Sequence, residues 1–220
     1  MKMFFCAIMA ALVVGALAAH AQDATWGTVS VQGICIYQIP PTVELEKGTY
    51  KKGFDKFLKT IFEIETSPDR IIAQPKGIND LDPVALNRYC RVIVETTRGS
   101  RGSYSKLDEP PSWSAAELKG LDIILRNQMQ QTADLHKKDG IKMTILSWQP
   151  TKIVLVNGAY ALLTTYTRSV QDDTSVLVHM YKIENNDCLH TITISYRESE
   201  SAMWAEDLGK VIGTFKFKKR

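Results

Sequence analysis

Four apolar runs in the segment Ile153–Arg197 constrain the fold more than any other feature of the chain. Only Asn157-Gly158 separates the first run from the second. An Asn-Gly pair between two apolar runs is the strongest short-range signal of a β-hairpin, because both turn residues need positive φ. Polar breaks at Gln171–Thr174 and Asn185–Asp187 separate the other runs. The pattern predicts four long antiparallel strands joined in series, a meander.

The first 21 residues are typical of a secretory signal peptide. Lys2 supplies a positive charge, Met3–Ala18 is almost unbroken in its apolar character, and Ala19-His20-Ala21 fits the small-x-small cleavage pattern. The apolar run is short for a membrane-spanning helix, which needs about 20 residues. We therefore expect residues 1–21 to be removed and residues 22–220 to form one exported domain, periplasmic or extracellular, without stable membrane insertion. A retained membrane anchor is the alternative.

Charge and cysteine content narrow the functional classes. The 27 Lys and Arg nearly balance the 24 Asp and Glu, whereas a dedicated nucleic-acid binder usually has a strongly basic face. We expect no nucleic acid among the partners. Three cysteines follow the signal segment: Cys35, Cys90 and Cys188. All three are expected as small buried residues on strands, and one internal disulfide is the alternative.

Periodicity and capping predict the remaining elements. Short strands are expected at Val29–Val31, Ile34–Ile39, Arg70–Gln74 and Arg88–Glu95. Apolar residues at i, i+3, i+4, i+7 and i+8 predict a helix over Phe54–Phe62, for which a strand is the alternative.

Two further helices are expected in the second half of the chain. Ser114 and Glu117 match a capping box that starts the longest helix, Ser114–Asp139, expected to lie across the sheet. A last helix begins at Ser201, and Thr214–Lys218 alternates as an edge strand guarded by lysines. The elements predict the α+β class: one antiparallel sheet, mainly a meander, with packed helices.

This order of elements resembles the PsbP-like fold, which the extrinsic photosystem II protein shares with the Ran-binding nuclear import factor of yeast. The resemblance is carried by Ile153–Tyr166 with its Asn157-Gly158 turn, by Leu189–Ser195, and by the helix and strand of Trp204–Phe217. It covers most of residues 22–220, as a pattern without diagnostic motifs. It implies an α/β/α sandwich and a non-enzymatic binding or assembly factor. A fold alone establishes no activity.

Candidate chemistry is sparse in the sequence. Cys188 and His190 are two residues apart on a predicted strand and would point to one face, but tetrahedral zinc normally needs at least three protein ligands. The chain contains no Gly-x-Ser-x-Gly elbow and no glycine-rich phosphate loop. We therefore predict no catalytic residues, no metal site and no cofactor. An envelope hydrolase with an unrecognised site is the alternative to a binding factor.

The predicted binding residues lie on one face of the meander. With Asn185-Asn186-Asp187 as the turn, Val176, Val178 and Met180 would share an apolar face with Ile192, Ile194 and Tyr196. The opposite face would carry hydroxyls around a histidine: Thr165, His179, Thr191 and Thr193. Hydroxyls and a neutral imidazole both donate and accept hydrogen bonds, so this face suits a small polar ligand or an unknown partner protein. A solvated face of an amphipathic sheet is the alternative.

The second predicted site is the basic loop Thr97–Ser103. Arg98 and Arg101, together with backbone N–H groups of this glycine-containing loop, could bind a phosphate or sulfate. A solvated connection between two elements is the alternative.

Overall fold

A computed structural model shows the arrangement of the chain, and it describes residues 25–62, 70–111, 113–138, 142–170 and 174–220. The predicted signal peptide lies outside the described residues. The strands are β1 (Gly27–Val31), β2 (Cys35–Ile39), β3 (Val43–Leu45), β4 (Ile71–Pro75), β5 (Cys90–Arg98), β6 (Met143–Val156), β7 (Ala159–Val170), β8 (Thr174–Asn185), β9 (Cys188–Arg197) and β10 (Lys216–Phe217). The α-helices are α1 (Gly48–Phe62), α2 (Pro83–Leu86), α3 (Ala115–Lys138) and α4 (Ser201–Gly213). Short 3-10 turns occur at Ile78–Asp80 and Glu198–Glu200.

The predicted meander is confirmed, and it forms four adjacent strands of a seven-stranded sheet, with β6 at one edge. The strand order is β3-β4-β5-β9-β8-β7-β6, and each neighbouring pair is antiparallel. Asn157 and Gly158 form the turn between β6 and β7 with φ values of 47° and 86°, the positive values that this turn requires. The α+β class and the antiparallel meander are therefore confirmed.

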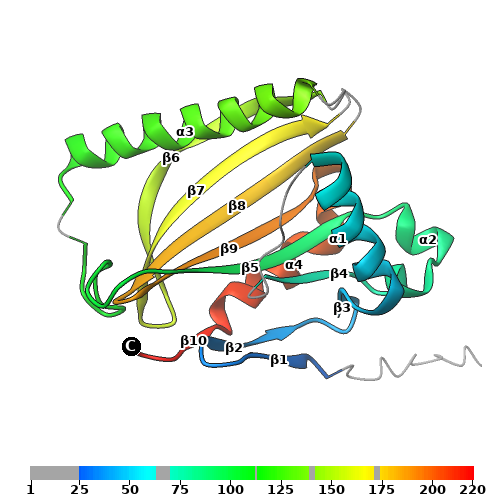
Figure 1. Cartoon of the computed structure of the whole chain (residues 1–220), viewed down its shortest axis with the longest axis horizontal. Helices are drawn as coiled ribbons and strands as arrows, with labels where there is room; N and C mark the ends of the chain where they lie inside the picture. Colours follow the sequence, from blue (N-terminus) through cyan, green and yellow to red (C-terminus); the bar gives the residue numbers. More distant parts are fainter. Residues whose placement is uncertain (1–24, 63–69, 112, 139–141, 171–173) are drawn as a thin grey trace, which may run out of the picture.

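The short strands outside the meander divide between two sheets. β3, β4 and β5 extend the large sheet, whereas β1, β2 and β10 form a separate three-stranded sheet at the bottom of Figure 1. β10 lies at an edge of this small sheet, next to β2, as the alternation of its lysines predicted. α4 contacts both β2 and β9 and so joins the two sheets.

The main hydrophobic core fills the space between the two sheets. It combines residues of the large sheet, such as Val92 and Ile192, with Tyr37 of β2 and with Trp204 and Leu208 of α4. All five side chains are at most 1% exposed. The face of the large sheet that points to this core is called the core face below.

The opposite face of the large sheet carries α3 and is called the α3 face. The capping box that predicted this helix is present: the N–H of Glu117 donates to Ser114 Oγ at 3.3 Å, and the N–H of Ser114 donates to Glu117 Oε2 at 2.7 Å. α3 packs along the edge strand β6. There Asp122 accepts a hydrogen bond from Trp148 Nε1, and Tyr166 Oη donates to the sulfur of Met129. α3 therefore lies on the meander as expected, but it packs along the edge strand β6 and not across the sheet.

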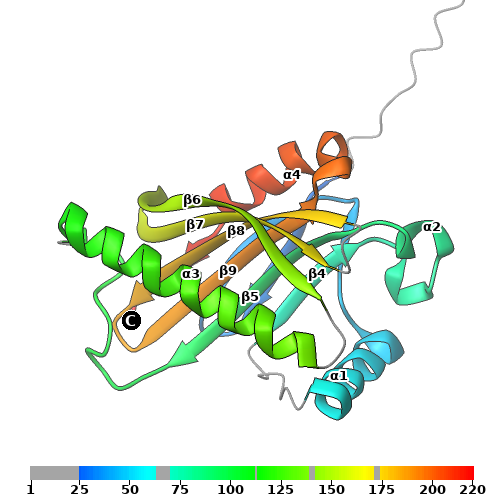
Figure 2. The same cartoon turned by 90° about the horizontal axis from the view of Figure 1, so that it is seen from above.

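α1 lies on the same side of the large sheet as α3, and α4 lies on the other side (Figure 2). The helix predicted over Phe54–Phe62 is confirmed, and it begins six residues earlier, at Gly48. The alternative of a strand in this segment is wrong. The structure describes the backbone of this helix but not the apolar side chains from which it was predicted.

The three cysteines follow the main expectation. Cys35, Cys90 and Cys188 lie on β2, β5 and β9, and each is buried as a free thiol. Burial raises the pKa of Cys35 and of Cys90 to about 12. These thiols therefore stay protonated at neutral pH and pack as small apolar groups.

One prediction about the sheet is wrong. Met180 pairs with Thr193, and Val178 pairs with Ser195, so the apolar residues of β8 do not share a face with Ile192 and Ile194. The reason is the turn between β8 and β9. It contains two residues, with Asn186 at φ 60°, and Asn185 pairs with Cys188. The predicted three-residue turn shifts the pairing by one position, which moves every side chain to the other face.

Candidate binding site

The corrected register separates the residues that were predicted to form one hydroxyl face. Thr165 and His179 lie opposite each other on the core face, and Thr165 Oγ1 is 3.0 Å from His179 Nδ1. Thr165 is buried and His179 is half-buried. Burial, followed by the nearby charge of Lys152, lowers the pKa of His179. These two side chains are thus mainly engaged with each other.

Thr191 and Thr193 lie on the α3 face, where both are half-buried. Figure 1 looks onto this face, with α3 above, α1 at the right, and β8, β9 and β5 running between them. The premise that these threonines share a face with Thr165 and His179 is wrong. A binding role for the predicted residues stays a prediction, and only Thr191 and Thr193 lie on the surface described next.

A row of polar side chains crosses the α3 face. Lys182 of β8 pairs with Thr191 of β9, and Thr191 pairs with Glu95 of β5. Glu95 Oε1 lies 3.0 Å from Nε of Arg70, which directly precedes β4. Directly paired residues of antiparallel strands point to the same side of a sheet. Lys182, Thr191, Glu95 and Arg70 therefore form one row, called the polar strip below.

All four side chains of the polar strip are half-buried. On the same strands, the neighbouring core-face residues Val94 and Ile192 are fully buried. The α3 face therefore exposes part of a lysine side chain, of a threonine side chain and of an ion pair to solvent. Along β5 and β9, Glu95 and Thr191 alternate with buried residues of the core face.

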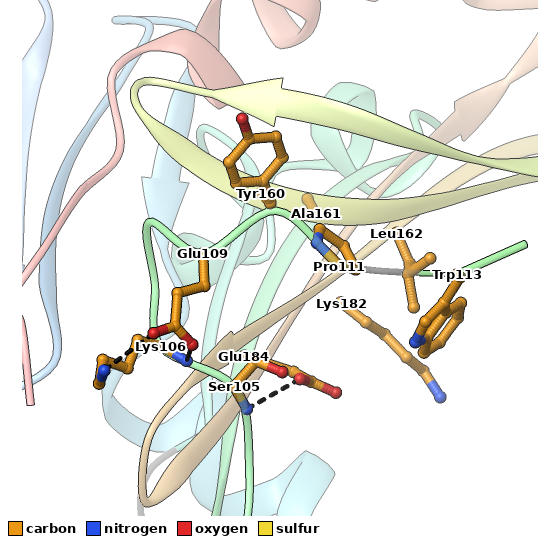
Figure 3. A pocket seen from close by; sticks show the side chains of 10 residues that line it. All are labelled: Ser105, Lys106, Glu109, Pro111, Trp113, Tyr160, Ala161, Leu162, Lys182 and Glu184. Atoms are coloured by element: carbon orange, nitrogen blue, oxygen red, sulfur yellow. Dashed lines mark hydrogen bonds and ion pairs between the residues drawn. The ribbon is translucent and has the colours of Figure 1, made fainter.

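A recess lies at the Lys182 end of the polar strip (Figure 3). Its walls come from the hairpin end of β7 and β8 and from the segment that leads into α3, and its volume is about 20 Å³, enough for about one water molecule. The lining residues are Ser105, Lys106, Glu109, Pro111, Trp113, Tyr160, Ala161, Leu162, Lys182 and Glu184. In Figure 3, Trp113, Leu162 and Lys182 lie on one side, and Lys106 and Glu109 on the other.

Backbone and side-chain hydrogen bonds fix the segment that forms the outer wall. The N–H of Ser105 donates to Glu184 Oε2 at 3.0 Å, and the N–H of Asn186 donates to the carbonyl oxygen of Ser105 at 2.9 Å. Further along, the N–H of Tyr160 donates to the carbonyl oxygen of Leu107 at 3.2 Å. The wall is therefore held against β7 and β8 before the chain enters α3.

Most charged groups of the recess already have partners. Lys106 Nζ lies 2.8 Å from Glu109 Oε1, and Glu184 accepts the bond from Ser105. Lys182 differs, because no hydrogen bond or ion pair engages its ammonium group within the described residues. Burial lowers the pKa of Lys182. A half-buried cation without a partner favours an incoming anion or acceptor, which would offset its lost hydration.

The loop of Arg98 and Arg101 has a different environment from the one predicted. The N–H of Gly99 donates to the carbonyl oxygen of Asp187 at 2.7 Å, and the N–H of Gly102 donates to Asn186 Oδ1 at 2.9 Å. These two N–H groups are used to hold the loop against the β8–β9 turn. An anion site in this loop would thus depend on the arginine side chains and not on these two amides.

The pair Cys188 and His190 lies on the core face, fully buried. His190 Nδ1 is 3.0 Å from Thr96 Oγ1, and His190 Nε2 is 3.2 Å from Asn185 Nδ2. Both ring nitrogens are therefore engaged inside the protein. In the described part of the chain, no group of three or more His, Cys, Asp or Glu residues is placed to hold a metal ion.

The comparisons with known proteins bear on the fold. No family model and no curated protein matches the sequence. The solution structure of cyanobacterial PsbP from Synechocystis sp. PCC 6803 aligns with 90% of this chain and 96% of its own, at 13% identity and a TM-score of 0.49. A crystal structure from Bacteroides thetaiotaomicron VPI-5482 aligns with 84% of this chain and 46% of its own, at 7% identity and a TM-score of 0.44.

The first of these two structures is that of a PsbP protein. At this level of identity the similarity concerns the course of the backbone, so no site residue is transferred. In the described residues no helix has the length and apolar character needed to cross a membrane.

Sequence reasoning missed Trp113 and Lys182. Lys182 had a usable signal, since it is the one lysine of β8 and follows Val176, Val178 and Met180 at alternate positions of this strand. Trp113 lies in a segment without periodicity, and its position beside Lys182 depends on how the chain folds between β5 and α3. No local pattern encodes that contact.

Proposed function

We propose that this protein is an exported, non-enzymatic binding or assembly factor of the cell envelope. Its binding surface is the polar strip together with the recess at the Lys182 end, and it takes an unknown partner protein or a small polar ligand. The observation that carries the proposal is the half-buried Lys182, whose ammonium group has no partner within the described residues, in a recess lined by Trp113. Ligand sites typically combine apolar and aromatic walls with a small number of placed polar or charged groups.

Export is supported by the sequence of the first 21 residues, which combines Lys2, an apolar run and a small-x-small motif. Mass spectrometry of the protein isolated from its native cells is the test. We expect a chain that begins at Gln22. A mature protein that retains Met1 would contradict export with cleavage.

Site-specific photo-cross-linking tests the binding surface in living cells. The photo-reactive residue p-benzoylphenylalanine is placed at Thr193, half-buried beside the polar strip, and, as a matched control, at Ala205, exposed on α4. We expect a discrete cross-linked product at Thr193 that is absent at Ala205. Identical products at both positions, or none at Thr193, would contradict the assigned surface.

Labelling with serine- and cysteine-directed activity probes tests the hydrolase alternative. A binding factor should show no labelling above that of heat-denatured protein. Saturable labelling of one residue in the folded protein would overturn the non-enzymatic proposal and favour the envelope hydrolase.

A further inference from the structure

The chemistry of the recess defines the group that it can accept. Lys182 supplies one positive charge that has no partner within the described residues, and Glu184 supplies one negative charge to the same lining. The other carboxylate of the lining, Glu109, is paired with Lys106. A singly charged anion would balance Lys182. A doubly charged phosphate would bring a second negative charge near Glu184, which is unfavourable at short range. The recess therefore suits a carboxylate better than a phosphate.

The apolar part of the lining indicates what the carboxylate is attached to. Trp113 and Leu162 lie on the same side of the recess as Lys182, and Tyr160 and Pro111 also line it. Burying an apolar side chain against such groups is favourable by about 25 cal/mol per Å². The ligand therefore combines a carboxylate with a neighbouring apolar group.

The start of α3 adds to the preference for an anion. Trp113 directly precedes Ser114, the residue that caps this 24-residue helix. The N-terminus of a helix carries a partial positive charge that favours anions nearby. This field supports the charge of Lys182 on the same side of the recess.

The polar strip indicates an extended ligand. From Lys182 it continues over Thr191 and Glu95 to Arg70, crossing from β8 to the start of β4. Neighbouring strands are about 4.8 Å apart, so the strip is roughly 14 Å long, the length of about four extended peptide residues. Its hydroxyl and charged groups can pair with peptide N–H and C=O groups.

We propose that the surface around Lys182 and Trp113, at this small recess, binds a peptide carboxylate that lies beside an apolar side chain, with the rest of the peptide extended along the polar strip. This inference rests on the proposed binding function and names the chemical class of the partner. The ammonium group of Lys182 pairs with the carboxylate, and the apolar side chain packs against Trp113. The carboxylate can belong to the C-terminus of the peptide or to an acidic side chain.

The test is a titration of the isotope-labelled protein, followed by NMR, with three short peptides. The first is acetyl-Ala-Ala-Ala-Phe with a free C-terminal carboxylate, and the second is the same peptide with a C-terminal amide. The third is acetyl-Ala-Ala-Glu-Phe-amide, whose only carboxylate is in a side chain. We expect saturable shifts of the Trp113 indole signal with the first or third peptide, and affinity lower by about tenfold or more for the second.

The first and third peptides distinguish the two sources of the carboxylate. Equal binding of all three would overturn carboxylate recognition, and so would tighter binding of inorganic phosphate than of either carboxylate peptide. Neither result would contradict the proposed function, provided that cross-linking at Thr193 still captures a partner. A missing cross-link together with carboxylate-selective binding would contradict the proposed function alone.

Three variants locate the binding in the recess. Lys182→Met keeps the length of the side chain and removes the charge, Lys182→Arg keeps the charge, and Lys210→Met removes a charge from the exposed surface of α4. We expect Lys182→Met to lose about tenfold or more in affinity, with Lys182→Arg restoring much of it and Lys210→Met unchanged. Because Lys182 has no partner to lose among the described residues, the Met variant should melt at the same or a higher temperature. Unchanged affinity in a folded Lys182→Met protein would overturn the proposal.

Discussion

The two faces of β5 and β9 differ, although the same strands build them. On the core face, Val92, Val94 and Ile192 are completely buried between the two sheets. On the α3 face, one residue further along each strand, Ile93, Glu95 and Thr191 are half-buried and mostly polar. On these two strands the core face carries the closest packing, and the hydrophobic cluster of the α3 face lies elsewhere, around Tyr166, Val176 and Val178. The α3 face of β5 and β9 can therefore carry polar groups whose contribution to stability is small, and such positions are available for recognition.

The largest expected difference between the two faces concerns two tryptophans. Trp204 is 1% exposed, and its indole N–H donates to Glu200 Oε2 at 2.8 Å, whereas Trp113 is half-buried in the recess. Trp204→Ala should lower the free energy of unfolding by about 3 to 5 kcal/mol. Trp113→Ala should lower it by about 1 kcal/mol or less. Urea unfolding of both variants measures the two losses, and equal losses would mean that the recess belongs to the core.

The next expected effect is a pH dependence of the free energy of unfolding, caused by His190 on the core face. Burial, and then the nearby charges of Arg220 and Arg98, lower the pKa of His190 from 6.5 to about 4, which the charge of Asp187 partly opposes. Because the unfolded chain binds the proton more readily, the stabilisation from neutral His190 is complete above pH 6.5. It is lost as the pH falls from 6.5 to 4, at a cost of about 3 kcal/mol.

Unfolding curves of the wild type and His190→Gln between pH 4 and 7.5 measure this loss. Gln cannot titrate, so its curve should be flatter in that window. His179→Gln is the control, because His179 is half-buried and should show a smaller difference. If the wild type and His190→Gln curves had the same slope, His190 would not be the titrating group.

A smaller effect is expected where α3 joins the sheet. Asp122 Oδ1 accepts hydrogen bonds from Trp148 Nε1, Thr151 N and Thr151 Oγ1 at 2.9, 2.8 and 2.7 Å. Burial raises the pKa of Asp122, but these hydrogen bonds outweigh it, so the pKa lies below its ordinary value. The ionised Asp122 carboxylate therefore stabilises the folded protein above the ordinary pKa of aspartate, and this stabilisation is lost as the pH falls below that value.

Asp122→Ala should lower the free energy of unfolding by about 1 to 2 kcal/mol and speed hydrogen exchange in α3 more than in β9. Glu206→Ala, which removes an exposed pair with Lys210, is the control with an expected change near zero. Uniformly faster exchange in α3 and β9 would show that α3 unfolds only together with the sheet.

Local signals predicted most of the fold. The Asn157-Gly158 turn and the Ser114–Glu117 capping box are encoded within a few residues, and both occur in the structure. The register between β8 and β9 was not predictable in this way. A turn of two residues and one of three have the same polar composition here, and the choice depends on Asn186 adopting positive φ. One residue of difference placed Thr165 and His179 on the opposite face from Thr191 and Thr193.

The candidate site was less predictable than the fold for a related reason. Lys182 and Thr191 belong to the β8–β9 hairpin, whereas Glu95 and Arg70 come from earlier in the chain and meet the hairpin only through the order β4-β5-β9-β8. A single sequence does not state which strands become neighbours when they are not joined by a short turn. Thr191 and Thr193 were correctly predicted to share a face, because residues two apart on one strand point to the same side of the sheet. That face is the α3 face.

The construction of β6 has a consequence for how the protein behaves at high concentration. β6 is a 14-residue edge strand of the large sheet, and its pairing with β7 is interrupted between Ile145 and Ser147 and again between Gln149 and Lys152. Pro150 within the second interruption lacks an N–H group. A strand of another molecule could therefore not form a regular row of hydrogen bonds with β6, because the strand is irregular and one N–H donor is missing. Self-association into extended β-aggregates through this edge is disfavoured.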